Sequence, residues 1–99
     1  MFRLPDVELE QALEYHDKLI TKRAKATSDV YKYTEQRKIA FSIALINASD
    51  LKMTQPMKEA VANSNEDVVN YTEKIAKAKE EESLLTGKIN NLEHKLRLF

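Results

Sequence analysis

The chain has 99 residues, a formal net charge of +0 and no cysteine. This length allows one domain at most. The lack of cysteine excludes a disulfide framework and thiolate chemistry. The zero net charge gives no electrostatic preference for a class of partner. One glycine and two prolines, with 32% charged and 42% hydrophobic residues, are typical of long amphipathic helices. We therefore expect an all-α protein.

The first expected element is one very long helix, from about residue 6 to about residue 48. Asp6 follows Pro5 as a candidate N-cap, and no glycine or further proline occurs before Pro56. Such a helix would be roughly 65 Å long. Its apolar 4-3 seam comprises Leu13, Ile20, Ala24, Thr27, Tyr31, Thr34, Lys38, Phe41, Leu45 and Ala48. The segment 39–46 is apolar nearly all round, which predicts burial on several sides.

A break at residues 47–55 comes next, where Asn47, Ser49 and Asp50 end the first helix. A short helix is expected at about 55–62. Thr54 is its candidate N-cap, and Pro56 is tolerated in a first helical turn.

The last expected helix covers about residues 65–98, and Ser64 with Asp67 predicts a variant capping box at its start. Its apolar stripe comprises Val68, Thr72, Ile75, Ala78, Glu82, Leu85, Ile89, Leu92, Leu96 and Phe99. A buried Glu82 would be costly unless paired, so we expect a shift of the stripe or an edge position for Glu82. Gly87 lies in mid-helix, where it allows another helix to approach closely.

Together these elements predict an antiparallel, coiled-coil-like hairpin of two long helices with a short helical elbow, in a single domain across residues 1–99. The apolar faces exceed what two helices can cover, which predicts a homodimer or higher oligomer. The residues expected in the core or at the oligomer contact are Ile20, Tyr31, Phe41, Leu45, Val68, Ile75, Leu85, Ile89, Leu92 and Leu96.

The most basic segment, residues 18–38, is the best candidate for a binding surface. The residues predicted to bind nucleic acid are Lys18, Lys22, Arg23, Lys25, Lys32, Tyr33, Arg37 and Lys38. A lysine row along one helix face can neutralise several phosphates, and tyrosine rings can stack on unpaired bases. Tyr31 also fits the apolar seam, so at least one of Tyr31 and Tyr33 is expected in the core. The alternative, a solvated face that complements the helix dipole, is the commoner outcome for such segments.

Residue chemistry indicates no enzyme, no cofactor and no metal. His16 and His94 lie one on each long helix and could meet near the open end of the hairpin, but a zinc site needs two further ligands. Asp17 and Glu93 are the candidates, without a supporting spacing. Glu80–Glu82 is interpreted as a solvated face, and no phosphate loop, nucleophile elbow or Ser/His/Asp set occurs. No apolar run nears 18 residues, so we expect a soluble, unexported protein without a membrane span.

The order of features carries a resemblance over residues 19–99. An A-x-x-Y-x-x-T/E-x-x-K segment at 26–38 precedes an apolar helix end, a T-x-x-M-K-E-A elbow at 54–60 and a long helix with Tyr71. This order resembles small helical proteins of tailed phages encoded among recombination and replication genes, similar to UvsY-type recombination mediators. Members of that group often carry aromatic residues near the C-terminus, where this chain has Leu96, Leu98 and Phe99.

The resemblance implies an oligomer in the cytoplasm of an infected bacterium that binds single-stranded DNA and assists a recombinase or single-strand-binding protein. No small-molecule substrate is expected. One alternative is a protein-binding inhibitor or adaptor, such as a phage anti-defence protein acting on a host nuclease complex. Its motivation is the zero net charge and the acidic segments at residues 6–17 and 80–82. A structural coiled-coil assembly protein is the other alternative.

Overall fold

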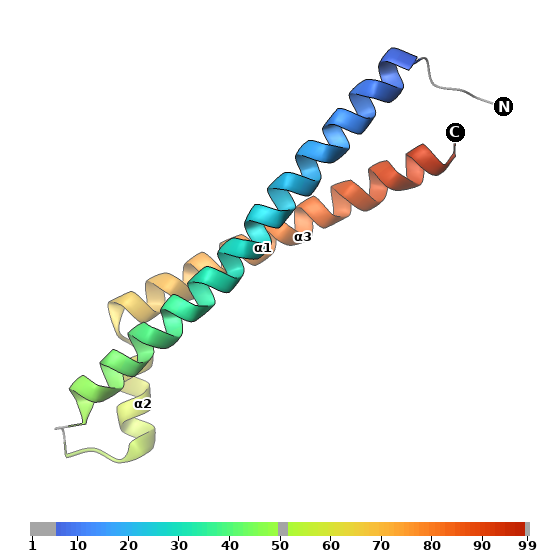
Figure 1. Ribbon diagram of the computed structural model, residues 1–99. Helices are drawn as coiled ribbons and strands as arrows, with labels where there is room; N and C mark the ends of the chain where they lie inside the picture. The colour runs from blue at the N-terminus through green and yellow to red at the C-terminus, as the bar shows by residue number, and fades with distance from the viewer. Residues whose placement is uncertain (1–5, 50–51, 99) are drawn as a thin grey trace. The chain divides into compact units, whose positions relative to one another are not determined.

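The computed structural model describes residues 6–49 and 52–98 and contains three helices in them. Helix α1 spans Asp6–Ala48, α2 spans Gln55–Asn63 and α3 spans Glu66–Arg97 (Figure 1). These bounds lie within one residue of those expected from the sequence. The all-α class and the order of a long, a short and a second long helix are therefore confirmed.

Helices α1 and α3 pack antiparallel. Side-chain hydrogen bonds join His16 to Glu93, Thr27 to Glu82 and Arg37 to Thr72. In these pairs the residue number on α3 decreases as the residue number on α1 increases, as it does when two helices run antiparallel.

Local hydrogen bonds end α1 and begin α2. The backbone nitrogen and the hydroxyl of Ser49 both donate to the carbonyl oxygen of Ile46, at 3.1 and 2.6 Å. Thr54 occupies the N-cap position of α2 with an extended backbone, as expected, although its hydroxyl makes no capping bond. The expected roles of the Asp6 side chain and of Asp50 concern groups outside the described residues.

The predicted capping box at Ser64 is wrong. Ser64 is the C-cap of α2, and its hydroxyl donates to the carbonyl oxygen of Val61 at 2.8 Å. Its backbone is helical, whereas an N-cap residue is extended. Asn65 caps α3 instead, because its Oδ1 accepts a hydrogen bond from the backbone nitrogen of Asp67 at 3.0 Å.

The chain forms two compact units. We call the first the terminal unit, which contains the residues up to Ser28 and those from Lys79 onward. The second, the central unit, is Asp29–Ala78.

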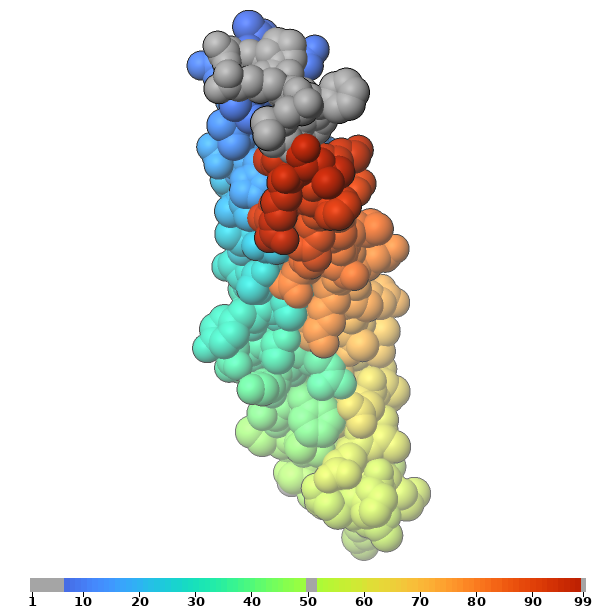
Figure 2. All heavy atoms as spheres, turned by 90° about the vertical axis from the view of Figure 1, so that its right-hand side faces the viewer, coloured from blue at the N-terminus to red at the C-terminus, as the bar shows by residue number. Residues whose placement is uncertain are grey.

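In the terminal unit, large aliphatic side chains of α1 and α3 form the core. Leu19, Ala26, Leu85 and Ile89 are buried, and the half-buried Ile20 and Leu92 pack against them. The space-filling view shows the last turns of α3, in red, directly against the blue turns of α1 (Figure 2). Ile89 is only 1% exposed, so this core centres on one fully buried isoleucine.

The core of the central unit is made mostly of small side chains. The buried residues are Ala44, Ala48, Ala62, Val68 and Ala78. Phe41, Leu45 and Ile75 are half-buried around them. An alanine methyl removes little apolar area from water, so this unit depends on close helix approach more than on bulky side chains.

Between residues 19 and 37, the face of α1 that packs against α3 lies one residue from the predicted seam, whereas Phe41, Leu45 and Ala48 at the end of that seam are half-buried or buried as expected. Ala24, Thr27 and Tyr31 of that seam are exposed. The interior stripe is Leu19, Arg23, Ala26, Val30, Tyr33 and Arg37, all buried or half-buried. A shift of one residue rotates the face by about 100°. The interior stripe contains two arginines, which do not count as apolar when stripes are compared by their number of apolar residues. Arginine nevertheless buries its aliphatic stem readily.

Two expectations about apolar residues of α1 are wrong for the single chain. Tyr31 is 71% exposed and lies outside the core; its place at an oligomer contact stays a prediction. In the segment 39–46, Ile39, Ile43 and Ile46 are 61%, 54% and 68% exposed, because only one side of the helix faces the rest of the unit.

On α3, Glu82 and Gly87 show how the predicted stripe is accommodated. Glu82 is half-buried, in agreement with the expected edge position, and it also accepts a hydrogen bond from the Thr27 hydroxyl. A Cβ added at Gly87 would meet no atom within 4 Å. The expected close helix approach at Gly87 is therefore wrong within the described residues.

Candidate nucleic-acid interface

A row of three lysines lies on one face of α1 in the terminal unit. Lys18, Lys22 and Lys25 follow the i, i+4, i+7 spacing, and all three are exposed. The row covers about 10 Å of helix. In the part of the chain that the structure describes, none of the three makes an ion pair within 4.0 Å. Their ammonium groups are thus accessible to an external anion.

A second basic group, in the central unit, includes two aromatic rings. The centroids of Tyr33 on α1 and Tyr71 on α3 are 6.5 Å apart, and the rings are tilted by 34°. Lys74 Nζ lies 5.5 Å from the Tyr33 centroid and 5.4 Å from that of Tyr71. Lys32 Nζ lies 5.9 Å from the Tyr33 ring. We call these four residues the tyrosine–lysine cluster.

The cluster revises the sequence prediction in two ways. Tyr33, predicted as a free stacking residue, is half-buried and pairs with Tyr71, whereas Tyr31 has the exposed ring. Tyr71 and Lys74 were not predicted as site residues. Their i, i+3 spacing on one helix was the only local signal, and nothing in the sequence placed them beside Tyr33.

Arg37 has a structural role within the central unit. Its Nε donates to Thr72 Oγ1 at 2.7 Å, and its Nη2 donates to Asn63 Oδ1 at 3.4 Å. These bonds link α1 to both α2 and α3. Arg23 is also half-buried on the interior stripe. Both arginines, which were predicted to bind nucleic acid, are therefore only partly exposed.

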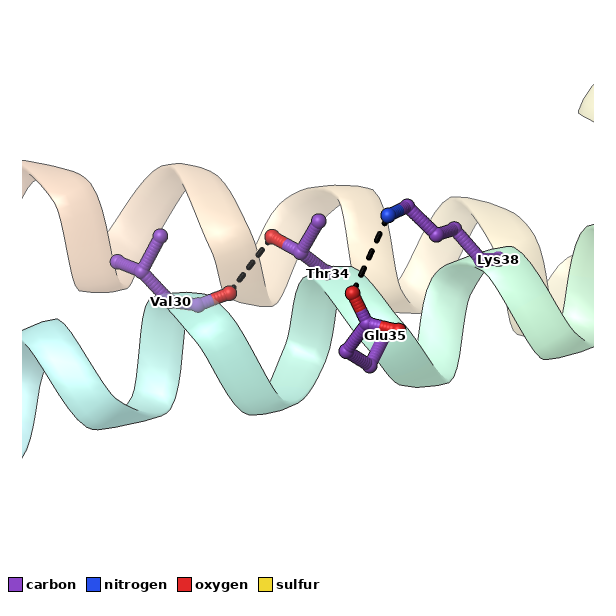
Figure 3. A network of polar contacts seen from close by, with 4 residues as sticks. All are labelled: Val30, Thr34, Glu35 and Lys38. Carbon is purple, nitrogen blue, oxygen red and sulfur yellow. Dashed lines mark hydrogen bonds and ion pairs between the residues drawn. The ribbon is translucent and has the colours of Figure 1, made fainter.

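Lys38 is exposed but already paired. Its Nζ lies 3.1 Å from Glu35 Oε1, one turn earlier on the same helix (Figure 3). Nearby, the Thr34 hydroxyl donates to the carbonyl oxygen of Val30 at 2.6 Å. An exposed i, i+3 pair contributes only a few tenths of a kcal/mol, so Lys38 can exchange Glu35 for an external anion at little cost.

The two histidines do not form a shared site. His16 Nε2 lies 3.0 Å from Glu93 Oε1, and this hydrogen bond lowers the pKa of Glu93 below its ordinary value of 4.5. His94 is exposed. Among the residues that the structure describes, no three His, Cys, Asp or Glu side chains are grouped to hold a metal ion. Within the same ranges, no helix is long and apolar enough to cross a membrane.

The Glu93 contact predicts a small acid sensitivity. Since folding lowers the pKa of Glu93, its contribution to stability is complete above the unfolded value near 4.5 and is lost as the pH falls through the lower folded value. We expect Glu93→Gln to destabilise the protein at neutral pH and to have no effect in strong acid. Urea unfolding of both proteins at about pH 6 and about pH 2 measures this. An equal difference at both pH values would contradict it.

No family model, curated protein or solved structure matches this chain. The chemistry of the exposed residues is therefore the basis for a functional proposal.

Proposed function

We propose that the chain is a non-enzymatic accessory protein of DNA recombination or replication that binds single-stranded DNA. The observation that carries the proposal is the exposed row Lys18, Lys22 and Lys25, which lacks intramolecular ion pairs among the described residues. Three ammonium groups on one helix face can replace the counterions of successive phosphates, which is the main source of sequence-independent affinity.

The tyrosine–lysine cluster supports single strands as the target. Tyr33 and Tyr71 are half-buried, and Lys32 and Lys74 lie beside their rings. Base stacking on an aromatic side chain contributes about 1–3 kcal/mol per base and requires bases that are unpaired. Lys32 and Lys74, beside the same rings, can pair with the phosphates of a stacked nucleotide.

The biological setting in this proposal follows from the resemblance described above. It comprises a phage-type recombination mediator in the cytoplasm of an infected bacterium, acting as an oligomer with a recombinase or a single-strand-binding protein. No catalytic step, cofactor or small-molecule substrate is part of the proposal.

A second candidate function is a protein-binding adaptor or inhibitor. It is favoured by the exposed isoleucines at positions 39, 43 and 46, which suit a protein partner better than a nucleic acid. The acidic side chains of residues 8–17 are exposed as well. A structural coiled-coil role remains the third hypothesis, and the presence of the protein in purified particles would distinguish it.

The direct test is binding of the wild-type chain to a fluorescent oligothymidylate at two salt concentrations. Each phosphate neutralised on a single strand contributes about −0.7 to the slope of log K against log salt, so three contacts give about −2. We expect affinity to fall roughly fifteen-fold between about 50 and about 200 mM salt. A duplex of equal length is the control and should bind more weakly, because its bases are already stacked. Absence of binding at the lower salt would remove this function and favour the protein-binding alternative.

A further inference from the structure

An uncharged apolar ridge runs along α1 in the central unit. Ile39, Ile43 and Ile46 have i, i+4, i+7 spacing and stay more than half exposed. Residues 39–49 contain no charged side chain, although 32% of the chain is charged. Three exposed isoleucines on one helical face leave an apolar stripe without a partner in the single chain.

A groove of about 380 Å³ lies beside this ridge, within the same unit. Ile39 and Ile43 form one wall, and Ala40 and Ala44 add small side chains to the same lining. Across from them, Tyr71 and Asp67 contribute from α3. The small alanines let an inserted side chain approach the helix backbone closely, as knobs do in helix packing.

The chemistry of the groove narrows the possible occupants. Asp67 is among its lining residues, and no basic residue of the described ranges is. Lys74, which lies 5.4 Å from the Tyr71 ring, is not part of the lining, so nucleic acid and anionic lipid would meet Asp67 and isoleucines there. A helix with an uncharged apolar ridge fits the groove better, through the helix-in-groove mode of recognition.

The ridge is itself such a helix, and its spacing is self-complementary. Ile39 lies four residues before Ile43, and Ile46 lies three residues after it. We place a two-fold axis through Ile43. A second copy that runs in the opposite direction therefore places Ile39 against Ile46 of the partner, within one residue of register. In a two-fold interface both copies use the same patch, so each would supply one ridge and one groove.

We propose that two copies of this chain associate antiparallel through the ridge Ile39–Ile43–Ile46, so that the two ridges pack against each other and extend over the groove walls that Ile39 and Ile43 form. This inference goes beyond DNA binding. The two proposals share Tyr71, but the lysine row that carries DNA binding is not part of the groove. A standard interface buries about 800 Å² on each partner. A ridge of three side chains supplies only part of that area even with the groove walls, so the dimer should dissociate on dilution.

Single-cysteine variants test the axis directly, because the natural sequence contains no cysteine. Disulfides need Cα atoms within about 7 Å of each other. Residue 43 lies on the proposed axis, whereas two copies of residue 39 would be offset by about 12 Å along the helices. We expect Ile43→Cys to cross-link at least tenfold faster than Leu84→Cys. Leu84 is the matched control, since it is 61% exposed and lies in the terminal unit. A mixture of Ile39→Cys and Ile46→Cys should form mixed dimers faster than either variant alone.

Light scattering gives a second, independent readout. The wild type should show twice the chain mass of 11.4 kDa at high concentration and approach the single mass on dilution. Ile43→Glu should lose the dimer, while Leu84→Glu retains it, with unchanged helix content by circular dichroism in both. A monomeric wild type at all concentrations would overturn the proposal, as would equal cross-linking of Leu84→Cys. Rapid cross-linking of Ile39→Cys with itself would indicate parallel pairing and overturn it too.

The two proposals fail separately. Loss of DNA binding in a chain that still dimerises would contradict only the DNA-binding function. A monomer that still binds single strands with a steep salt dependence would contradict only the dimer.

Discussion

Replacing Lys18, Lys22 and Lys25 together by glutamate is expected to lower the affinity for single-stranded DNA on the order of a hundredfold at low salt. Each replacement removes one phosphate contact and introduces a repelling carboxylate at the same place. The slope of log K against log salt should become shallower by about 2. Fluorescence anisotropy titrations at several salt concentrations measure both quantities.

The matched control carries the same change of net charge on the other long helix. Lys79, Lys88 and Lys95 are exposed on α3 in the terminal unit. Their replacement by glutamate should weaken binding far less, since only long-range electrostatics changes. If both triple variants lose affinity equally, the lysine row is not the contact surface. All six replacements are at exposed helical positions, where lysine and glutamate have similar helix propensities.

Ile89→Ala is expected to reduce the free energy of unfolding by about 2–4 kcal/mol. Ile89 is 1% exposed and lies against Leu19, Ala26 and Leu85, so the deleted carbons leave a cavity that two packed helices can only partly close. Domains of this size are stable by about 5–15 kcal/mol, so the loss is a large fraction of the total. Urea unfolding measures this loss of free energy, followed by circular dichroism at about 222 nm, where the signal reports helix content.

Leu84→Ala is the control for this change. Leu84 is 61% exposed on the same helix, and its truncation should cost less than about 1 kcal/mol. A similar loss for both variants would mean that the core of the terminal unit is not centred on Ile89. Because unfolding of a dimer depends on concentration, both variants should be compared at one protein concentration.

The candidate site was only partly predictable. The lysine row could be read from spacing alone, because i, i+4 and i+7 share a face of any helix. The tyrosine–lysine cluster could not, since it joins Tyr33 of α1 to Tyr71 and Lys74 of α3. The role of Arg37 could not be predicted either. In the sequence it is one more basic residue, whereas in the structure its hydrogen bonds join three helices.

By itself, the sequence determined the helices and their ends. Pro56 and the Asn- and Ser-rich breaks act on the backbone within a few residues, so local chemistry alone places these boundaries. The capping residue of α3 was the exception, since Ser64 and Asn65 are adjacent candidates and only the backbone conformation distinguishes them.

Only the tertiary structure decided which face of α1 is interior. Two stripes one residue apart carry similar numbers of apolar side chains. The choice between them depends on contacts between residues far apart in the chain, such as the packing of Leu19 and Ala26 of α1 with Leu85 and Ile89 of α3. That choice exposed Tyr31 and buried part of Tyr33. The free energy that determines which face of α1 is interior depends on contacts with side chains of α3. It therefore cannot be predicted from the residue pattern of α1 alone.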